Sequence, residues 1–141
     1  MVCESKKRTG VAGFTLVELL IVVVIIGVLA SVAIPTLDEA RARAHFTAIV
    51  SDFRHLSQAQ EHHFQVNMTY AEDLGALGFI STQGVEVIVS EATAQGWAAT
   101  GTHASLAADQ GCSIYLGNAA APALPNGQAH GSGPGVADCA R

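Results

Sequence analysis

The apolar residues of this 141-residue chain are concentrated in one run near the N-terminus. Phe14–Ile34 holds 21 residues, of which only Glu18 is charged. A helix of that length spans about 31 Å at 1.5 Å per residue, which matches the thickness of a bilayer core. An ordinary secretory signal has a shorter apolar region and a small-residue cleavage site, whereas Pro35 follows this run at once. The pattern therefore predicts a helix that enters a membrane.

The stretch from Thr36 to about Gln65 contains neither glycine nor proline and is expected to continue the helix. Pro35 lacks an N–H group, so it should bend the helix rather than end it. One stripe has the spacing of a wide apolar face and should cover a sheet: Phe46, Ile49, Val50, Phe53, Leu56, Gln60 and Phe64. A narrow stripe of mostly small residues is assigned to contacts with neighbouring chains: Leu37, Ala40, Ala44 and Ala48. The alternative, that both stripes form one broad core face, stays open.

The remaining residues, 67–141, are expected to form a small globular head. Residues 67–83 are interpreted as a loop with a short helix near Ala71–Leu77. Three strands are predicted between turn signals: Val85–Glu91, Gly96–Ala104 and Cys112–Leu116. Short strands joined by brief loops favour an antiparallel meander. The expected fold class is α+β: a long N-terminal helix, with an apolar and an amphipathic half, packed on a small antiparallel sheet.

Residues 117–141 are rich in glycine and proline, a composition that by itself favours disorder. Cys112 and Cys139 bracket this tail, and an even pair of cysteines in an exported region predicts a disulfide. On the chain-entropy model such a bridge stabilises by about 3–4 kcal/mol. We therefore expect a disulfide-closed C-terminal loop.

The balance of charge excludes some functions. The net charge is −5, and without residues 1–13 the bases fall from seven to four and the acids from twelve to eleven, which leaves about −7. Such a chain lacks the basic patch that nucleic-acid binding needs.

His55 and His62 lie seven residues apart on the helix, about 10 Å, too far to share one metal ion. With no Ser/His/Asp set and no phosphate-binding glycine loop, we expect no enzyme, no metal and no cofactor.

Glu18 is the residue that a plain membrane anchor does not explain. A carboxylate inside an apolar span costs up to about 3 kcal/mol and usually has a partner. If the chain were cut before Phe14, the new α-amine would lie one helical turn from Glu18, and the amine of one chain could meet Glu18 of another. The alternative is a carboxylate that reaches toward the lipid headgroups.

The string Gly13-Phe14-Thr15-Leu16-Val17-Glu18, followed by an apolar run that ends at Ala33-Ile34-Pro35, resembles the N-terminus of type IV pilins and of the pseudopilins of type II secretion. The resemblance implies that residues 1–13 are a prepilin leader. Prepilin peptidase would cleave between Gly13 and Phe14, and Phe14 would become N-methylated. Glu18 would guide subunits into a filament by neutralising the neighbouring amine, and Pro35 would kink the helix.

The same resemblance implies the organisation of the whole chain. Residues 14–35 would be a transmembrane and filament-core helix, 36–66 an amphipathic helix and 67–141 the head. The partners would be copies of the chain in a helical homopolymer, prepilin peptidase and an inner-membrane assembly platform. The precursor would sit in the inner membrane as a single-pass protein, and the mature subunit in an extracellular pilus at the cell surface.

The resemblance leaves the role of the filament open among attachment, twitching motility and DNA uptake. The disulfide-closed tail resembles the exposed C-terminal loop of pilins, whereas many major pseudopilins have a calcium site instead. Here Asp109 and Asp138 stand apart without calcium-like spacing. This favours a pilin, with a type II secretion pseudopilin as the alternative. A membrane-anchored binding module or enzyme is a third hypothesis.

Overall fold

The computed structural model describes residues 13–140 and forms one long helix and four strands. The chain divides into two units, one ending at Asp38 and the other beginning at Glu39. The helix α1 (Leu16–Asn67) contributes residues to both units. Pro35 lies inside α1, and helical backbone is assigned on both sides of it. The predicted helix is therefore confirmed, whereas the kink at Pro35 stays a prediction.

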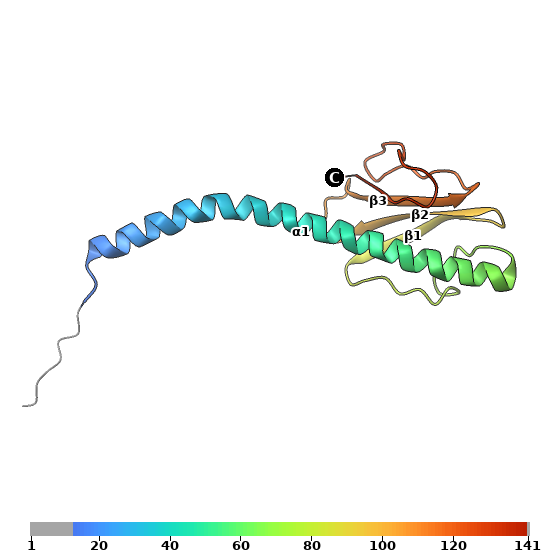
Figure 1. Ribbon diagram of the computed structural model, residues 1–141, viewed down its shortest axis with the longest axis horizontal. Coiled ribbons are helices and arrows are strands. Elements are labelled where there is room, and N and C mark those ends of the chain that lie inside the picture. Colours follow the sequence, from blue (N-terminus) through green and yellow to red (C-terminus); the bar gives the residue numbers. More distant parts are fainter. Residues whose placement is uncertain (1–12, 141) are drawn as a thin grey trace, which may run out of the picture. The chain divides into compact units, whose positions relative to one another are not determined.

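In the second unit, α1 packs against a sheet through the face that the periodicity predicted (Figure 1). Ile49, Phe53 and Leu56 are completely buried, and Gln60 on the same face is buried too. Their neighbours in the core include strand residues Val85, Val87, Trp97, Ala99, Cys112 and Ile114. Removing side chains of this size from water is the main stabilising term for such a head. The apolar spacing of α1 thus fixes which side of the helix faces the sheet.

The narrow stripe of small residues does not belong to this core. Ala40 and Ala44 are exposed, and Ala48 is half-buried at the margin of the core. The alternative that both stripes form one broad buried face is therefore wrong for Ala40 and Ala44. Their assignment to neighbouring chains stays a prediction.

The sheet is antiparallel, with its strands in sequence order: β1 (Val85–Ala92), β2 (Gly96–His103), β3 (Gly111–Gly117) and β4 (Asp138–Ala140). The three predicted strands are confirmed, but the expected three-stranded sheet has a fourth strand. That strand has three residues, and Cys139 pairs directly with Cys112. A segment of three residues is too short to show an alternating pattern, so its position in the sheet is set by its pairing with β3.

Close packing between helix and sheet depends on a residue without a side chain. At Gly101 an added Cβ would lie 2.7 Å from Ile49 Cγ2 and 3.0 Å from Phe53 Cζ. Overpacking of this kind forces a backbone shift or strained rotamers. Gly101 therefore lets β2 approach α1 closely at the centre of the core.

The loop 68–84 connects α1 to β1 and contains no helix, so the short helix predicted near Ala71–Leu77 is wrong. The backbone N–H of Gly75 donates to Asp73 Oδ1 at 2.9 Å, a local bond that competes with helix formation. Gly78 follows with φ +62°, in the left-handed region. Turns at these glycines replace the expected helix.

Candidate functional site

The N-terminal end of α1 is closed by a reciprocal pair of hydrogen bonds between Thr15 and Glu18. Glu18 N–H donates to Thr15 Oγ1 at 3.2 Å, and Thr15 N–H donates back to Glu18 Oε2 at 3.1 Å. The Thr15 hydroxyl also donates to Oε2, at 3.0 Å. This is a capping box, which satisfies amide groups that the first helical turn leaves free. Thr15 therefore holds the one acidic side chain of the apolar run in a fixed orientation.

Sequence reasoning singled out Glu18 but missed its partner. The pattern of Thr15 followed three residues later by Glu18 is the sequence signature of such a box and could have identified it. Both hydrogen bonds that Thr15 donates to the carboxylate end on Oε2. The second oxygen, Oε1, receives no hydrogen bond within the described residues, so the carboxylate keeps one oxygen for another donor.

The predicted cleavage point lies just before this cap. Gly13 and Phe14 have no regular secondary structure, and Phe14 is 86% exposed. Irregular, exposed backbone is where proteolysis concentrates, because a peptidase must bind the chain in extended form. Residues 1–12 of the predicted leader, including Lys6, Lys7 and Arg8, lie outside the described residues. Cleavage between Gly13 and Phe14 stays a prediction.

An unbroken apolar surface follows the cap. The large apolar side chains from Phe14 to Ile34 are 50–86% exposed. By length and composition this part of α1 could cross a membrane. Its few hydroxyls bond to the helix backbone: Ser31 Oγ donates to Val28 O at 2.7 Å and Thr36 Oγ1 to Ala33 O at 2.8 Å. Because these groups are already paired, they cost little in lipid or between packed helices.

In the second unit, two buried polar side chains of α1 hold loop 68–84. Asp52 accepts hydrogen bonds from the Thr82 N–H and hydroxyl, both at 2.7 Å. Gln60 forms two bonds with Ala71, one from its amide to the carbonyl at 2.6 Å and one from the Ala71 N–H at 2.9 Å. Asp52 and Gln60 are 1% and 0% exposed. Sequence reasoning placed Gln60 on the buried face but gave neither residue this role.

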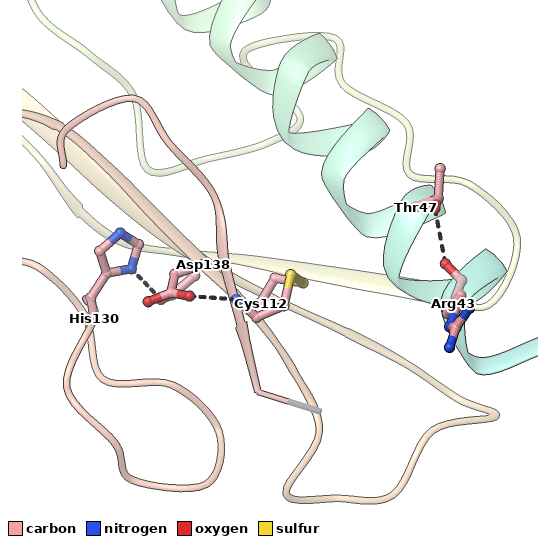
Figure 2. The surroundings of a disulfide bond; sticks show 7 residues. Arg43, Thr47, Cys112, His130 and Asp138 are labelled. Atoms are coloured by element: carbon pink, nitrogen blue, oxygen red, sulfur yellow. Dashed lines mark hydrogen bonds between the residues drawn. A yellow bond between two sulfur atoms is a disulfide. The ribbon is translucent and has the colours of Figure 1, made fainter. Parts of the chain in front are cut away.

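The predicted Cys112–Cys139 disulfide is present and joins β3 to β4 (Figure 2). A histidine of the enclosed loop is tied to the same strand, because His130 Nδ1 lies 2.7 Å from Ser113 Oγ. The ring of His130 also meets that of Tyr115 edge-on, with centroids 5.1 Å apart. The glycine- and proline-rich tail is thus held at its two ends by the disulfide, and between those ends by the contacts of His130.

Two side chains of the head have shifted acidities. Burial, and then the charge of His45, lowers the pKa of His103 below its ordinary value of 6.5. The Ser105 N–H donates to His103 Nδ1 at 3.0 Å, a bond that requires Nδ1 to be unprotonated. Burial, and then the hydrogen bond to Glu61, raises the pKa of Tyr70, whose hydroxyl lies 3.0 Å from Glu61 Oε1.

The described residues contain no group of three or more histidine, cysteine or acidic side chains that could hold a metal ion. Ser113 and His130 are neighbours, but Ser113 is completely buried, so its hydroxyl cannot act as a nucleophile toward a substrate. The features of the described residues that stand out are the cap, the exposed apolar helix and the anchored loops.

Comparison with known proteins points to the same segments. Residues 8–34 match the family model described as the prokaryotic N-terminal methylation motif. The type IV major pilin protein PilA of Myxococcus xanthus is 38% identical over 72 residues, 51% of this chain and 33% of the relative. The type IV wide pilus major component PilA4 of Thermus thermophilus is 43% identical over 65 residues, 46% of this chain and 50% of the relative.

A secretion protein is similar as well. The type II secretion system core protein G of Klebsiella pneumoniae is 34% identical over 83 residues, which cover 59% of this chain and 54% of that protein. Across these three relatives the chain spans between one third and about half of their length.

Proposed function

Because the chain belongs to the type IV pilin and pseudopilin family, we propose that it is a structural subunit of an extracellular type IV pilus. The observation that carries this proposal is the apolar half of α1, which is exposed along its length and has one carboxylate, held by a cap at its first turn. Such a surface needs a lipid or protein partner. Copies of the same helix would supply that partner after the subunit leaves the membrane.

Processing would prepare the helix for this transfer. Prepilin peptidase would cut between Gly13 and Phe14 and leave an α-amine at Phe14, which would then be methylated. In the membrane the precursor would be a single-pass protein with its head outside, bound to an inner-membrane assembly platform. The mature chain would have no catalytic activity of its own.

The cap suggests how Glu18 takes part. Thr15 occupies Oε2 and leaves Oε1 for the amine of a neighbouring subunit. A charge-assisted bond between them would offset the cost of burying both groups among apolar helices. Subunits would then join with the amine of one chain beside the carboxylate of the next.

The experiment is to shear filaments from cells that produce the chain and analyse them by mass spectrometry. We expect a subunit that begins at methylated Phe14. Gly13→Ala should leave an uncut chain in the membrane, and Glu18→Ala should be cut normally yet assemble poorly. Filaments of normal amount from either variant, or a surface protein that still begins at Met1, would contradict the proposal.

A pseudopilin of type II secretion is the second candidate, because core protein G of that system is similar over more than half of this chain. Both candidates use the same helix and the same processing. They differ in the consequence of deleting the gene: loss of surface pili supports the first, and retention of secreted enzymes inside the cell with pili intact supports the second. The disulfide-closed loop favours the pilus.

A further inference from the structure

A groove of about 630 Å³ runs along one side of α1 in the second unit. It is lined by Arg43, Phe46, Thr47, Val50, Ser51 and Arg54 of the helix and by Cys139 of the disulfide. Figure 2 shows Arg43 and Thr47 on the helix that passes the disulfide. Eleven residues separate Arg43 from Arg54, about three helical turns, so both cations lie on the same side of α1, roughly 16 Å apart along its axis. The groove therefore has a positive charge toward each end and an apolar floor between.

Arg43 and Arg54 are two of the few positively charged residues in this chain. From Phe14 onward there are four bases and eleven acids, and 4 − 11 gives a side-chain charge of −7. Arg43 lies 3.6 Å from Glu39, but both side chains are about three-quarters exposed, and such a pair contributes little. Arg54 is exposed and, within the part of the chain that the structure describes, forms no ion pair. Both guanidinium groups can therefore receive an additional carboxylate.

Copies of a chain with this charge repel one another unless their acids meet cations. Electrostatic complementarity at an interface removes that repulsion and fixes which surfaces meet. A carboxylate partner for the groove is therefore the arrangement that lets many copies pack side by side. The chain itself has a pair of exposed carboxylates on its surface.

Glu72 and Asp73 are adjacent, exposed acids on loop 68–84. Asp73 Oδ1 accepts a bond from Gly75 in its own loop, and neither acid is paired with a cation among the described residues. The loop is fixed to α1 by the bonds of Gln60 to Ala71 and of Asp52 to Thr82. The two acids therefore project from an anchored loop rather than from a free one, which lowers the entropy lost on binding.

The acidic loop and the groove lie on opposite flanks of the head. The end of the loop that carries the acids is held by Gln60, which is six residues after Arg54 and so about a third of a turn around the helix from it. Figure 1 shows loop 68–84, in yellow-green, on the other side of the helix and sheet from the C-terminal segment, in red, which contains Cys139. One molecule therefore cannot fill its own groove with its own acids.

We infer that the groove between Arg43 and Arg54 receives the Glu72–Asp73 loop of a second copy of this chain. The inference rests on the proposed function and adds the contact that joins neighbouring heads. Two different surfaces meet in this contact, so it is heterologous: each added copy leaves one groove and one acidic loop free. Contacts of this kind that do not close into a ring generate an open helical filament.

Charge reversal tests the contact in the full chain. Arg43→Glu with Arg54→Glu should lower the amount of sheared filament about tenfold or more, which corresponds to about 1.4 kcal/mol in one contact. Glu72→Arg with Asp73→Arg should have the same effect. All four substitutions together should restore assembly, because the charges are exchanged rather than lost. The processed chain should stay at its normal level in the membrane throughout.

Matched controls reverse exposed charges elsewhere. Arg41→Glu lies on the same helix outside the groove, and Asp109→Arg lies in the turn between β2 and β3. Both should assemble as the wild type does. A second experiment combines Arg54→Cys and Asp73→Cys in one chain. Mild oxidation of its filaments should give a ladder of covalent multimers that neither single variant gives.

Several outcomes would overturn the inference. Normal filaments from the double arginine variant, no rescue by the exchanged charges, or no covalent ladder in assembled filaments would each contradict it while leaving the proposed function in place. Arginine variants that assemble normally but no longer bind anionic vesicles or DNA would also contradict the inference. A cross-link between positions 54 and 73 in membranes of cells that never make filaments would support this contact and contradict the proposed function.

Discussion

The imidazole ring of His103, at the end of β2, lies against the ring of His45 on α1, with centroids 3.9 Å apart and an interplanar angle of 31°. Gly84 is next to the same ring, where an added Cβ would lie 2.9 Å from His103 Nε2. With Ser105 donating to Nδ1, neutral His103 carries its proton on Nε2. Protonation of His103 at Nδ1 would remove that bond. The hydrogen bond from Ser105 therefore holds the His103 ring in this position only while His103 is neutral.

This contact predicts a loss of stability in mild acid. The pKa of His103 is lowered in the folded chain, so the unfolded chain binds the proton more readily. The free energy of unfolding should be fully retained above about pH 6.5 and should fall as the pH drops below it. The slope should stay under about 1.4 kcal/mol per pH unit, the limit for one proton. Urea denaturation of the detergent-solubilised chain between pH 7.5 and 5.5 measures it.

The matched variants for this prediction are His103→Asn, whose amide oxygen can replace Nδ1 as an acceptor, and His62→Asn on the exposed helix surface. The first should flatten the pH dependence, and the second should leave it unchanged. Arg41, one turn before His45, and Glu86, which lines the same hollow as His103, are the charged neighbours to keep intact. An equal slope in both variants would show that the histidine pair is not responsible.

The capping box predicts a specific role for the Thr15 hydroxyl. Thr15→Val removes the cap at similar size, whereas Thr15→Ser keeps it, and losing such a cap costs about 1 kcal/mol. Without it the Glu18 carboxylate is no longer held for an incoming amine. We expect about fivefold less filament from the valine variant, with normal processing, and near-normal assembly from the serine variant. Equal filament yields from valine and serine would rule out the cap as an assembly element.

The two hydrogen bonds from Thr82 to the buried Asp52 carboxylate predict an effect of Asp52 on loop 68–84. Asp52→Ala would remove both hydrogen bonds from Thr82 to the buried carboxylate, and hydrogen bonds to a charged group contribute about 1.5–3 kcal/mol. Asp52→Asn keeps one acceptor and should lose less. Gln58→Ala, an exposed change on the same helix, should stay within about 0.5 kcal/mol. Denaturation curves measure the loss of stability, and hydrogen exchange at residues 81–83 measures how firmly this end of the loop is held. Slow exchange in Asp52→Ala would refute the anchoring role.

The disulfide predicts a loss of order that is confined to the C-terminal loop. The bridged cysteines are 27 residues apart, and on the chain-entropy model their bridge is worth about 3–4 kcal/mol. Cys112→Ala with Cys139→Ala should expose residues 117–138 to protease while the helix content, measured by circular dichroism, is retained. His130→Ala with the bridge intact is the control for contacts within the loop. Unchanged protease resistance in the double cysteine variant would contradict a structural role for the bridge.

The N-terminal end of α1 could be predicted from the sequence because its determinants are local. The run Phe14–Ile34, the single Glu18 and the Thr15–Glu18 cap spacing all lie within consecutive helical turns. The same holds for the buried face of α1, where Phe46, Ile49, Phe53 and Leu56 recur at helical spacing. Alternating residues likewise predicted β1, because periodicity and burial are coupled within each element.

Other features depend on residues that are distant in sequence and form no pattern. The strand β4 exists because Cys139 pairs with Cys112, and loop 68–84 is not helical because Asp73 and its glycines form turns while Asp52 and Gln60 of α1 bind its two ends.

The sequence by itself determined the helix, its buried face and the residues at its N-terminal tip, since each follows from spacing along one chain segment. Only the tertiary structure decided that His103 meets His45, and that Cys139 closes a groove beside Arg43 and Arg54. Those contacts arise when the sheet packs on the helix, and the positions of side chains on two separate elements are set by that packing rather than by either segment alone.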